Sequence, residues 1–340
     1  MESLRSFRFV LLAALAAPLT ACDGSQDPAT LAPVSALNAS AAAAAKSACP
    51  LQRCIIVTNA VSRRNGTGSI VFFARNAHGN ASPANVIDGS LTKLNYPIGI
   101  TLDSEGTVYA ANFESSSITV YAAGASGNAA PIRTIAGTKT GLLAPAGIVL
   151  DSAGELLVAN NNHDSVTVYA AKSNGNVSPI RTISGNKTLL SHPWGIALDS
   201  KSNIYVSQGT SIAIFAANAK GNAAPERMIS GSLTQLGEAE GIAVDGQGYT
   251  YVADWGTAKL DVFAPDANGD QPPVRQDTSG LYAPDGVALN ASNKIYVSDG
   301  CQDNPAYVIV YPAGSNNAQP LRQIEGSKTH LNCSTNIAVR

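Results

Sequence analysis

Short runs of alternating hydrophobic and polar residues recur at regular intervals along the chain from about residue 50 onward. In Ile118-Thr119-Val120-Tyr121, apolar and polar side chains alternate with the period of two that is typical of a β-strand. The aromatic residue that ends this run recurs every 46 to 48 residues, at Phe73, Tyr121, Tyr169, Phe215, Phe263 and Tyr311. A fixed period of this length predicts a repeat architecture, so the length of 340 residues does not imply two separate domains.

Two sets of glycines follow the same period. One set stands inside an apolar run, as in Pro97 to Asp103, and comprises Gly99, Gly147, Gly195, Gly241 and Gly286. The other set lies six residues after each aromatic residue and comprises Gly79, Gly127, Gly175, Gly221, Gly269 and, in the last unit, Asn317. Asparagine is the residue that best replaces glycine at positive φ, so the second set predicts a hairpin turn.

One repeat unit contains four predicted strands, at residues 99–102, 108–111, 118–122 and 131–135. The first two are joined by Asp103-Ser104-Glu105-Gly106, which has Asp first and Gly fourth, as a type I turn prefers. The fourth is polar and contains Pro131, which is tolerated in an edge strand. Four antiparallel strands repeated every 45 to 50 residues are typical of a β-propeller blade.

The two ends of the chain are expected to share a blade. The aromatic landmark occurs six times, but the first-strand glycine occurs only five times. The missing first strand is found at residues 336–340, which align with residues 99–103 and should pair with residues 55–59. The sequence therefore predicts an all-β fold, a six-bladed propeller of residues 49–340, whose ring is closed by the C-terminal strand so that no sheet edge is left unpaired.

The pattern Pro-x-Gly-Ile-x-Leu-Asp, followed by a Val-Tyr strand that ends in Asn, resembles the NHL repeat. It is seen in Pro97 to Asp103 with Val108 to Asn112, and the resemblance covers nearly all of the chain after residue 50. It implies a propeller fold. NHL-like propellers include protein-binding sensor domains, scaffolds and a few lyases, so the resemblance assigns no single function.

The first residues of the chain read as an export signal. Arg5 and Arg8 precede the apolar run 9–17, which is too short to span a bilayer and has the length of a signal-peptide core. Leu19-Thr20-Ala21-Cys22 resembles the lipobox of bacterial lipoproteins, which implies cleavage after residue 21 and acylation of Cys22, palmitate included. Residues 22–48 are rich in Ala, Ser and Pro and read as a flexible tether. The alternative is an ordinary secretory signal with an incidental Cys22. The sequence thus predicts a lipid-anchored protein of the bacterial cell envelope that faces outside the cytoplasm.

Composition limits the partners. The net charge is −2, so no basic field exists that would hold nucleic acid. Charged residues make up 14% of the chain, below the ~25% of an average domain, which disfavours long salt-bridged helices. We expect a monomer that contacts the membrane through its lipid anchor only.

Four further cysteines, an even number in an exported protein, predict disulfides. In a propeller, the loop that holds Cys301 and the segment that holds Cys333 lie on the same face, which favours a bond between Cys301 and Cys333. Cys49 with Cys54 then follows as a local pair. Cys54 with Cys333 is the second choice.

The entrance of the central channel should be lined by two sets of residues. The first set, one residue before each landmark glycine, comprises Ile98, Ala146, Trp194, Glu240, Asp285 and Thr335. The second, at the ends of the second strands, comprises Asn59, Asn112, Asn160, Gln208, Asp254 and Asp299. Three consecutive blades supply apolar or aromatic groups and the next two supply carboxylates, so the mouth should be lopsided.

The carboxylates of the mouth suggest a metal site as one hypothesis. Glu240, Asp285, Asp254 and Asp299 could hold Ca²⁺ or another divalent cation through oxygen ligands. The local Glu-Gly and Asp-Gly pairs resemble the senescence-marker and gluconolactonase propellers, although no Asn precedes a landmark glycine here. The alternative is that the second-strand residues only form side-chain turns. A zinc site at His163, His192 and His330 has no supporting spacing.

The leading hypothesis from the sequence is a binding or scaffold module for an envelope protein, a peptide or a small molecule. Its recognition surface would be the channel mouth around Trp194, Trp255, Glu240 and Asp285, because tryptophan is common at interaction hot spots. No catalytic set is recognisable. The rival hypothesis is a metal-dependent lactonase, hydrolase or lyase that uses the carboxylates of the mouth.

Overall fold

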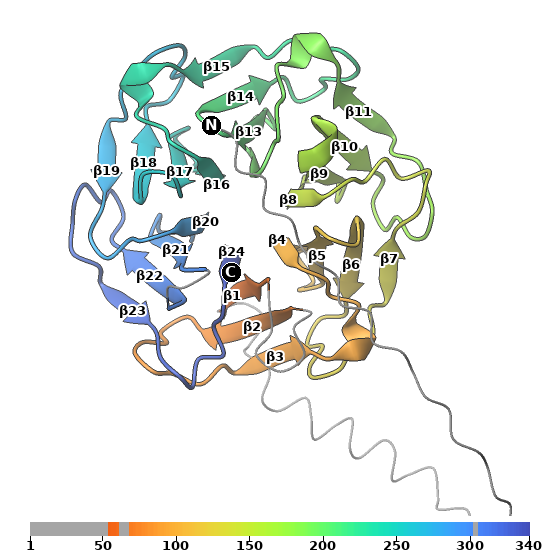
Figure 1. Ribbon diagram of the computed structural model, residues 1–340, viewed down its shortest axis with the longest axis vertical. Helices are drawn as coiled ribbons and strands as arrows, with labels where there is room; N and C mark the ends of the chain where they lie inside the picture. Colours follow the sequence, from red (N-terminus) through yellow and green to blue (C-terminus); the bar gives the residue numbers. More distant parts are fainter. Residues whose placement is uncertain (1–53, 61–67, 302–304) are drawn as a thin grey trace, which may run out of the picture. The chain divides into compact units, whose positions relative to one another are not determined.

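In the computed structural model, the described residues are 54–60, 68–301 and 305–340 (Figure 1). They form six four-stranded sheets in which neighbouring strands are antiparallel. The sheets are arranged around a central channel, with one strand of each sheet innermost (Figure 1). The six-bladed, all-β propeller expected from the repeat is therefore confirmed.

The strands of each blade are given from the channel outward. Blade 1 comprises β24 (Ser334–Val339), β1 (Cys54–Asn59), β2 (Ser69–Ala74) and β3 (Asn85–Asp88). Blade 2 comprises β4 (Pro97–Leu102), β5 (Val108–Asn112), β6 (Ser117–Tyr121) and β7 (Arg133–Ile135). Blade 3 comprises β8 (Pro145–Leu150), β9 (Leu156–Asn160), β10 (Ser165–Tyr169) and β11 (Arg181–Ser184).

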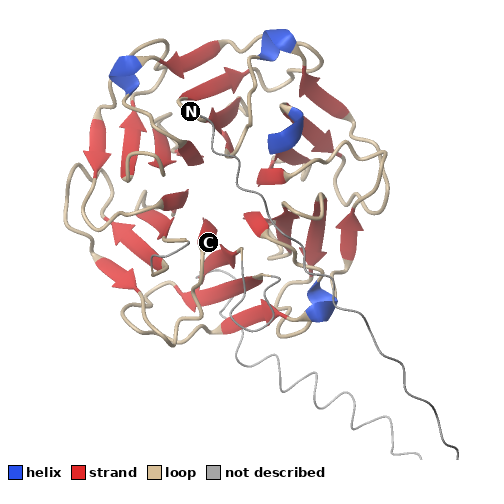
Figure 2. Ribbon diagram, in the orientation of Figure 1, coloured by secondary structure: helices blue, strands red, loops and turns tan. Residues whose placement is uncertain are grey.

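The remaining blades repeat this order. Blade 4 comprises β12 (Ile196–Leu198), β13 (Ile204–Gln208), β14 (Ser211–Phe215) and β15 (Arg227–Ser230). Blade 5 comprises β16 (Ala239–Val244), β17 (Thr250–Asp254), β18 (Lys259–Phe263) and β19 (Arg275–Asp277). Blade 6 comprises β20 (Pro284–Leu289), β21 (Ile295–Asp299), β22 (Tyr307–Tyr311) and β23 (Arg322–Ile324). Figure 2 shows the short 3-10 helices of the described chain, which are η1 (Ser90–Thr92), η2 (Asn161–His163), η3 (Asn186–Thr188) and η4 (Ser232–Thr234).

The C-terminal strand closes the ring, as the sequence predicts. β24 pairs with β1 in antiparallel register, with Val339 opposite Ile55 and Ile337 opposite Val57. A disulfide between Cys301, after β21, and Cys333, before β24, links blade 6 to this closing strand and confirms the favoured pairing over Cys54 with Cys333. Cys54 is also disulfide-bonded. Cys49, its expected partner, lies outside the described residues.

The landmark glycines of the inner strands are required because neighbouring backbones approach closely around the channel. The N–H of Gly147 in blade 3 donates to the carbonyl oxygen of Trp194 in the adjacent blade 4, at 2.6 Å. A Cβ on Gly147 would lie 2.5 Å from that oxygen and 2.8 Å from the nitrogen of Ile196. Any side chain there would force two backbones apart, so the repeated glycine is a consequence of the ring geometry.

The core lies between the blades. Six clusters of buried apolar residues each combine side chains of two adjacent blades, as Leu157 and Val168 of blade 3 pack with Val206 and Phe215 of blade 4. The six periodic aromatic residues are all fully buried. Where the residue is tyrosine, its hydroxyl donates a hydrogen bond to a backbone carbonyl oxygen. For example, Tyr121 Oη donates to the carbonyl oxygen of Thr92 at 2.6 Å. Burial of both faces explains why the strands read as largely apolar.

The hairpin turn inferred from the second set of glycines is also present. Gly127 has φ of 62° and its counterpart Asn317 has φ of 51°, so asparagine replaces glycine where the backbone is left-handed. In the hairpins that keep the glycine, the residue that follows the glycine contacts the adjacent blade. In one of these hairpins, Asn128 Oδ1 accepts a hydrogen bond of 2.7 Å from the N–H of Leu91. The fourth strand of blade 2 begins at Arg133 rather than at Pro131, because proline has no N–H to donate.

The predicted signal peptide, Cys22 and the tether lie outside the described residues. Within the part of the chain that the structure describes, no helix is long and apolar enough to cross a membrane.

Candidate functional site

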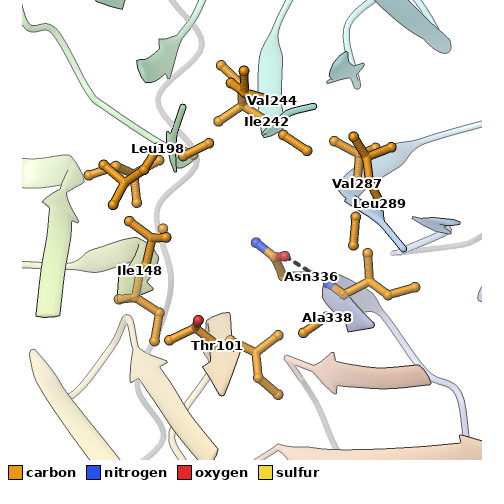
Figure 3. Close-up of a pocket in the computed structure, with 18 of the residues that line it drawn as sticks. Thr101, Ile148, Leu198, Ile242, Val244, Val287, Leu289, Asn336 and Ala338 are labelled. Atoms are coloured by element: carbon orange, nitrogen blue, oxygen red, sulfur yellow. Dashed lines mark hydrogen bonds between the residues drawn. The ribbon is translucent and has the colours of Figure 1, made fainter. Parts of the chain in front are cut away.

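The central channel has two chemically different parts. Beyond the landmark glycines it contains a cavity of about 290 Å³ whose walls are mostly aliphatic. Figure 3 shows Ile148, Leu198, Val244 and Leu289 around this cavity, with Asn336 projecting toward its centre. Asn336 occupies the landmark glycine position of blade 1, and its Oδ1 accepts a hydrogen bond from the N–H of Ile337. The side chains of this part of the channel are therefore mostly apolar, and Asn336 and Thr101 are its polar side chains.

The other part of the channel, at its mouth, opens into a pocket of about 350 Å³. Trp194 and Glu240, both from the positions before landmark glycines, contribute to its wall. The other wall residues are Asn161 of η2, Ala239 at the start of β16, and the loop residues Ser191, His192, Gly209 and Glu238. We call this cavity the mouth pocket. Its volume falls in the range of small-molecule sites.

Glu240 and Asp285 form a buried carboxyl pair at the mouth. They lie on the neighbouring inner strands β16 and β20, and they are 8% and 6% exposed. Their carboxyl groups are close enough for each to affect the pKa of the other. Apart from this contact, no donor of the described residues reaches Glu240 Oε2 or Asp285 Oδ2.

Burial is the main cause of the altered acidity of this pair. It raises the pKa of Glu240 to about 7, against a lowering by the hydrogen bond to Asp285 and a further rise from the charges of Glu238 and Asp254. Burial, followed by repulsion from Glu240, raises the pKa of Asp285 well above its usual range. Both carboxyl groups therefore hold their protons to higher pH than freely solvated carboxyl groups do.

Three aromatic side chains form a row of ring contacts that includes Trp194 of the mouth pocket. The rings of Phe113 and Trp194 are 5.8 Å apart, and those of Tyr96 and Phe113 are 6.2 Å apart. Phe113 belongs to blade 2 and Trp194 to blade 4, so this contact joins blades that are not neighbours. The pKa of Tyr96 is raised by burial and then by the negative charges of Asp285, Glu114 and Glu240, so this ring lies in the field of the carboxyl pair.

The second-strand residues hold loops and do not act together as ligands. Asp254 accepts hydrogen bonds from the N–H groups of Gly237 and Glu238, at 2.8 and 2.7 Å, and Asp299 accepts from Tyr282 and Ala283. Asn112 binds the N–H of Asn95 in the same way. The side chains of Asn59, Asn160 and Gln208 each make the equivalent bond in their own blades. All six side chains are buried.

Backbone amides of the adjoining loops already donate to the carboxylates of Asp254 and Asp299, two of the four residues suggested for a metal site with Glu240 and Asp285. Across residues 54–60, 68–301 and 305–340, no group of three or more His, Cys, Asp or Glu side chains is placed to hold a metal ion. The turn alternative, in which these residues shape strand ends, describes their contacts.

The remaining candidate residues are scattered over the mouth face. His192 lines the mouth pocket, whereas His163 Nδ1 contacts the carbonyl oxygen of Gly141 and His330 contributes its own carbonyl to a bond with Asn59. Trp255 follows β17, is 37% exposed and lies outside the pocket wall. Of the four residues proposed for ligand binding, Trp194 and Glu240 lie in the pocket wall, and Asp285 lies beside Glu240 but outside that wall.

The sequence reasoning missed Tyr96 and Phe113. Phe113 directly follows the second-strand end Asn112, as Trp255 follows Asp254, so the rule that singled out Trp255 could have found it. Tyr96 precedes Pro97 as His192 precedes Pro193, in a segment with positive φ at both residues.

No protein-family model matches the chain, and no curated protein matches it in sequence. Solved structures do match. A protein of unknown function from Bacteroides caccae is 11% identical, with a TM-score of 0.61 over 85% of this chain and 100% of its own. A chain from a nidogen/laminin complex is 17% identical, with a TM-score of 0.60 over 84% and 97%. A protein from Lactobacillus plantarum is 14% identical, with a TM-score of 0.54 over 81% and 82%. Similarities at these identities show a shared propeller fold and nothing finer.

Proposed function

We propose that this protein is a lipid-anchored, extracytoplasmic binding module of the bacterial envelope that recognises its ligand at the mouth pocket. The observation that carries the proposal is the combination of a 350 Å³ pocket, an aromatic wall and a carboxyl pair buried without protein donors. Sites that bind small molecules typically combine apolar walls with a few buried polar groups that lack protein partners.

The placement of the protein outside the cytoplasm rests on two supports. Disulfides such as Cys301–Cys333 form and persist mainly in oxidising compartments. The segment Leu19 to Cys22 has the lipobox pattern. The NHL-like repeat agrees with a binding role. A Cys22→Ala variant should lose metabolic labelling by palmitate and appear in the soluble fraction, and retention of both label and membrane association would contradict the anchor.

The binding function is tested with Trp194 as a reporter. In a Trp255→Phe background, Trp194 is the only tryptophan, so its fluorescence reports on the mouth pocket. We expect at least one class of a panel of amines, carboxylates, neutral sugars, lactones and short peptides to change this fluorescence saturably.

A pair of variants separates pocket binding from other effects. Ser191 is exposed and lines the pocket, so Ser191→Phe should block it and abolish the response. Ser152→Phe makes the same change on an exposed turn of blade 3, outside the pocket wall, and should leave the response intact. A response that survives Ser191→Phe, or a panel without any response, would refute the mouth pocket as the recognition site.

A further inference from the structure

We propose that the mouth pocket selects a primary ammonium group attached to an apolar or aromatic body, with the ammonium bound by Glu240 and Asp285. This inference rests on the proposed function, because it names the class of ligand that the same pocket takes. Four features of the mouth support it, and they concern charge, hydrogen bonding, shape and the coordination that a metal would need.

The neighbouring charges that act on the pair are negative. The groups whose charges act on Glu240 and Asp285 are Glu238 beside the pocket, Asp254 at the end of β17 and Asp299 at the end of β21, all of them acids. Glu114 adds to the negative field at Tyr96. Only His192 among the pocket-lining residues can become a cation. A ligand that enters this field is favoured if it brings the positive charge that the protein does not supply.

The hydrogen-bonding pattern selects for N–H donors. Glu240 Oε2 and Asp285 Oδ2 are both acceptors, and both are buried without a donor from the described protein groups. A buried acceptor without a partner is unfavourable, and a charge-assisted N–H bond is the strongest way to satisfy it. A primary ammonium has three N–H groups, enough for both oxygens, whereas a quaternary ammonium has none.

The walls of the pocket suit the apolar part of such a ligand. Trp194 contributes an aromatic surface beside Glu240, and Phe113 extends that surface at 5.8 Å. Ala239 and Gly209 add wall without further charge. An aromatic face close to a carboxylate also attracts a cation directly, through the quadrupole of the ring.

A divalent metal ion suits the same residues poorly. Calcium takes six to eight oxygen ligands, but the carboxylates of Asp254 and Asp299 are already bound to backbone amides. The described part of the chain holds no group of three acidic, histidine or cysteine side chains in reach of one ion.

The test uses a series of probes that differ in one group. 2-Phenylethylamine, 2-phenylethanol, 3-phenylpropionate and trimethyl(2-phenylethyl)ammonium share an aromatic body, and their affinities are measured by isothermal titration calorimetry at pH 8 with the full chain. At this pH the amine is still protonated, and the pH lies above the raised pKa of Glu240, which is about 7. We expect the primary amine to bind about 10- to 100-fold more tightly than the alcohol or the quaternary ammonium, and the carboxylate to bind most weakly.

Two variants link the selectivity to the pair. Glu240→Gln keeps the size of the side chain and should reduce amine affinity by about 10-fold or more, while the affinity for the alcohol stays within about twofold and shows that the pocket is intact. Asp277→Asn is the matched control, because Asp277 is likewise a buried carboxylate with one unpartnered oxygen but lies on the outer strand β19. It should leave the whole series unchanged.

The outcomes separate the two proposals. If the alcohol or the carboxylate binds as tightly as the amine, or if Glu240→Gln leaves amine binding unchanged, the ligand class is wrong and the binding function stands. The same holds if the probes fail but another class of the fluorescence panel binds at Trp194. If neither the probes nor any panel member binds, the proposed function itself fails.

Discussion

Replacing Glu240 by glutamine should change how the stability of the fold depends on pH. In the folded protein the pKa of Glu240 is raised from 4.5 to about 7, mainly by burial. The folded state therefore holds a proton that the unfolded chain releases at lower pH. The stabilisation by this proton is fully present below about pH 4.5 and is lost as the pH rises through about 7. Asp285, whose pKa is also raised, acts in the same direction.

The magnitude follows from the two pKa values. The difference between 4.5 and about 7 corresponds to about 3 kcal/mol, of which about 2 to 3 kcal/mol develops between pH 5 and pH 8. Glutamine cannot ionise, so Glu240→Gln removes this contribution. Relative to the wild type, the variant should gain about 2 to 3 kcal/mol in free energy of unfolding when the pH is raised from 5 to 8.

The assay is urea unfolding followed by tryptophan fluorescence at pH 5 and pH 8, in the absence of ligand. Glu105→Gln makes the same change on an exposed turn and should retain the pH dependence of the wild type. If the free energy of unfolding of Glu240→Gln differs from that of the wild type by the same amount at both pH values, the carboxyl of Glu240 is not held protonated by burial, and the reasoning about the pair is refuted.

Two further predictions concern the ring. The Cys301–Cys333 bond closes a loop of 32 residues, so under non-reducing conditions the double variant Cys301→Ser/Cys333→Ser should lose about 3 to 4 kcal/mol in free energy of unfolding; an unchanged urea midpoint would contradict this. Gly147→Ala would place a Cβ 2.5 Å from the carbonyl oxygen of Trp194 and should cost at least about 2 kcal/mol or prevent folding. Gly246→Ala, with nothing within 4 Å of the added atom, should unfold within about 0.5 kcal/mol of the wild type, and equal effects of the two changes would contradict the close-approach argument.

The fold could be predicted from the sequence because the physical causes of a propeller repeat with the blades. Gly147 and its counterparts are required by backbone contact, Tyr121 and its counterparts fill the space between blades, and Asn317 shows which glycines serve a left-handed turn. The strand that ends at Val339 lies at the C-terminal end of the chain but belongs to the first blade. It could be predicted because its sequence pattern matches the first-strand position that is missing at the N-terminal end. Each of these requirements acts within one blade or between adjacent blades. It therefore recurs at the same position of each repeat unit, where the sequence shows it.

The site was predictable only where a residue departs from the period. Glu240 and Asp285 stand where other blades have Ile98 or Ala146, and the departure marked them. Asp254 occupies the position of Asn112, and a carboxylate there accepts the same loop N–H groups as the amide oxygen does. The negative charge of Asp254 suggests a metal ligand, but its carboxylate already accepts the hydrogen bonds that hold the loop. Which way such a side chain points depends on donors about 17 residues earlier, and sequence spacing alone does not show that geometry.

The aromatic contact between Phe113 and Trp194 joins blades that are not neighbours. A repeat pattern describes how one blade resembles the next, and it contains no information about contacts that skip a blade. The contact needs an aromatic residue at the position of Trp194, which is Ala146 in blade 3. It depends on a difference between units, whereas the repeat records what the units share.

The pairing of β24 with β1 also sets a time for folding. β1 ends at Asn59 and its inner partner begins at Ser334, 275 residues later in synthesis. At 5 to 20 residues per second, roughly 15 to 55 s pass between the emergence of the two strands from the ribosome. Throughout this interval one edge of β1 has no partner within its own blade, and such an edge invites pairing with other chains. A chain that crosses a membrane unfolded and completes its ring afterwards would pass through this interval without exposing a half-built sheet to the crowded compartment where it is made.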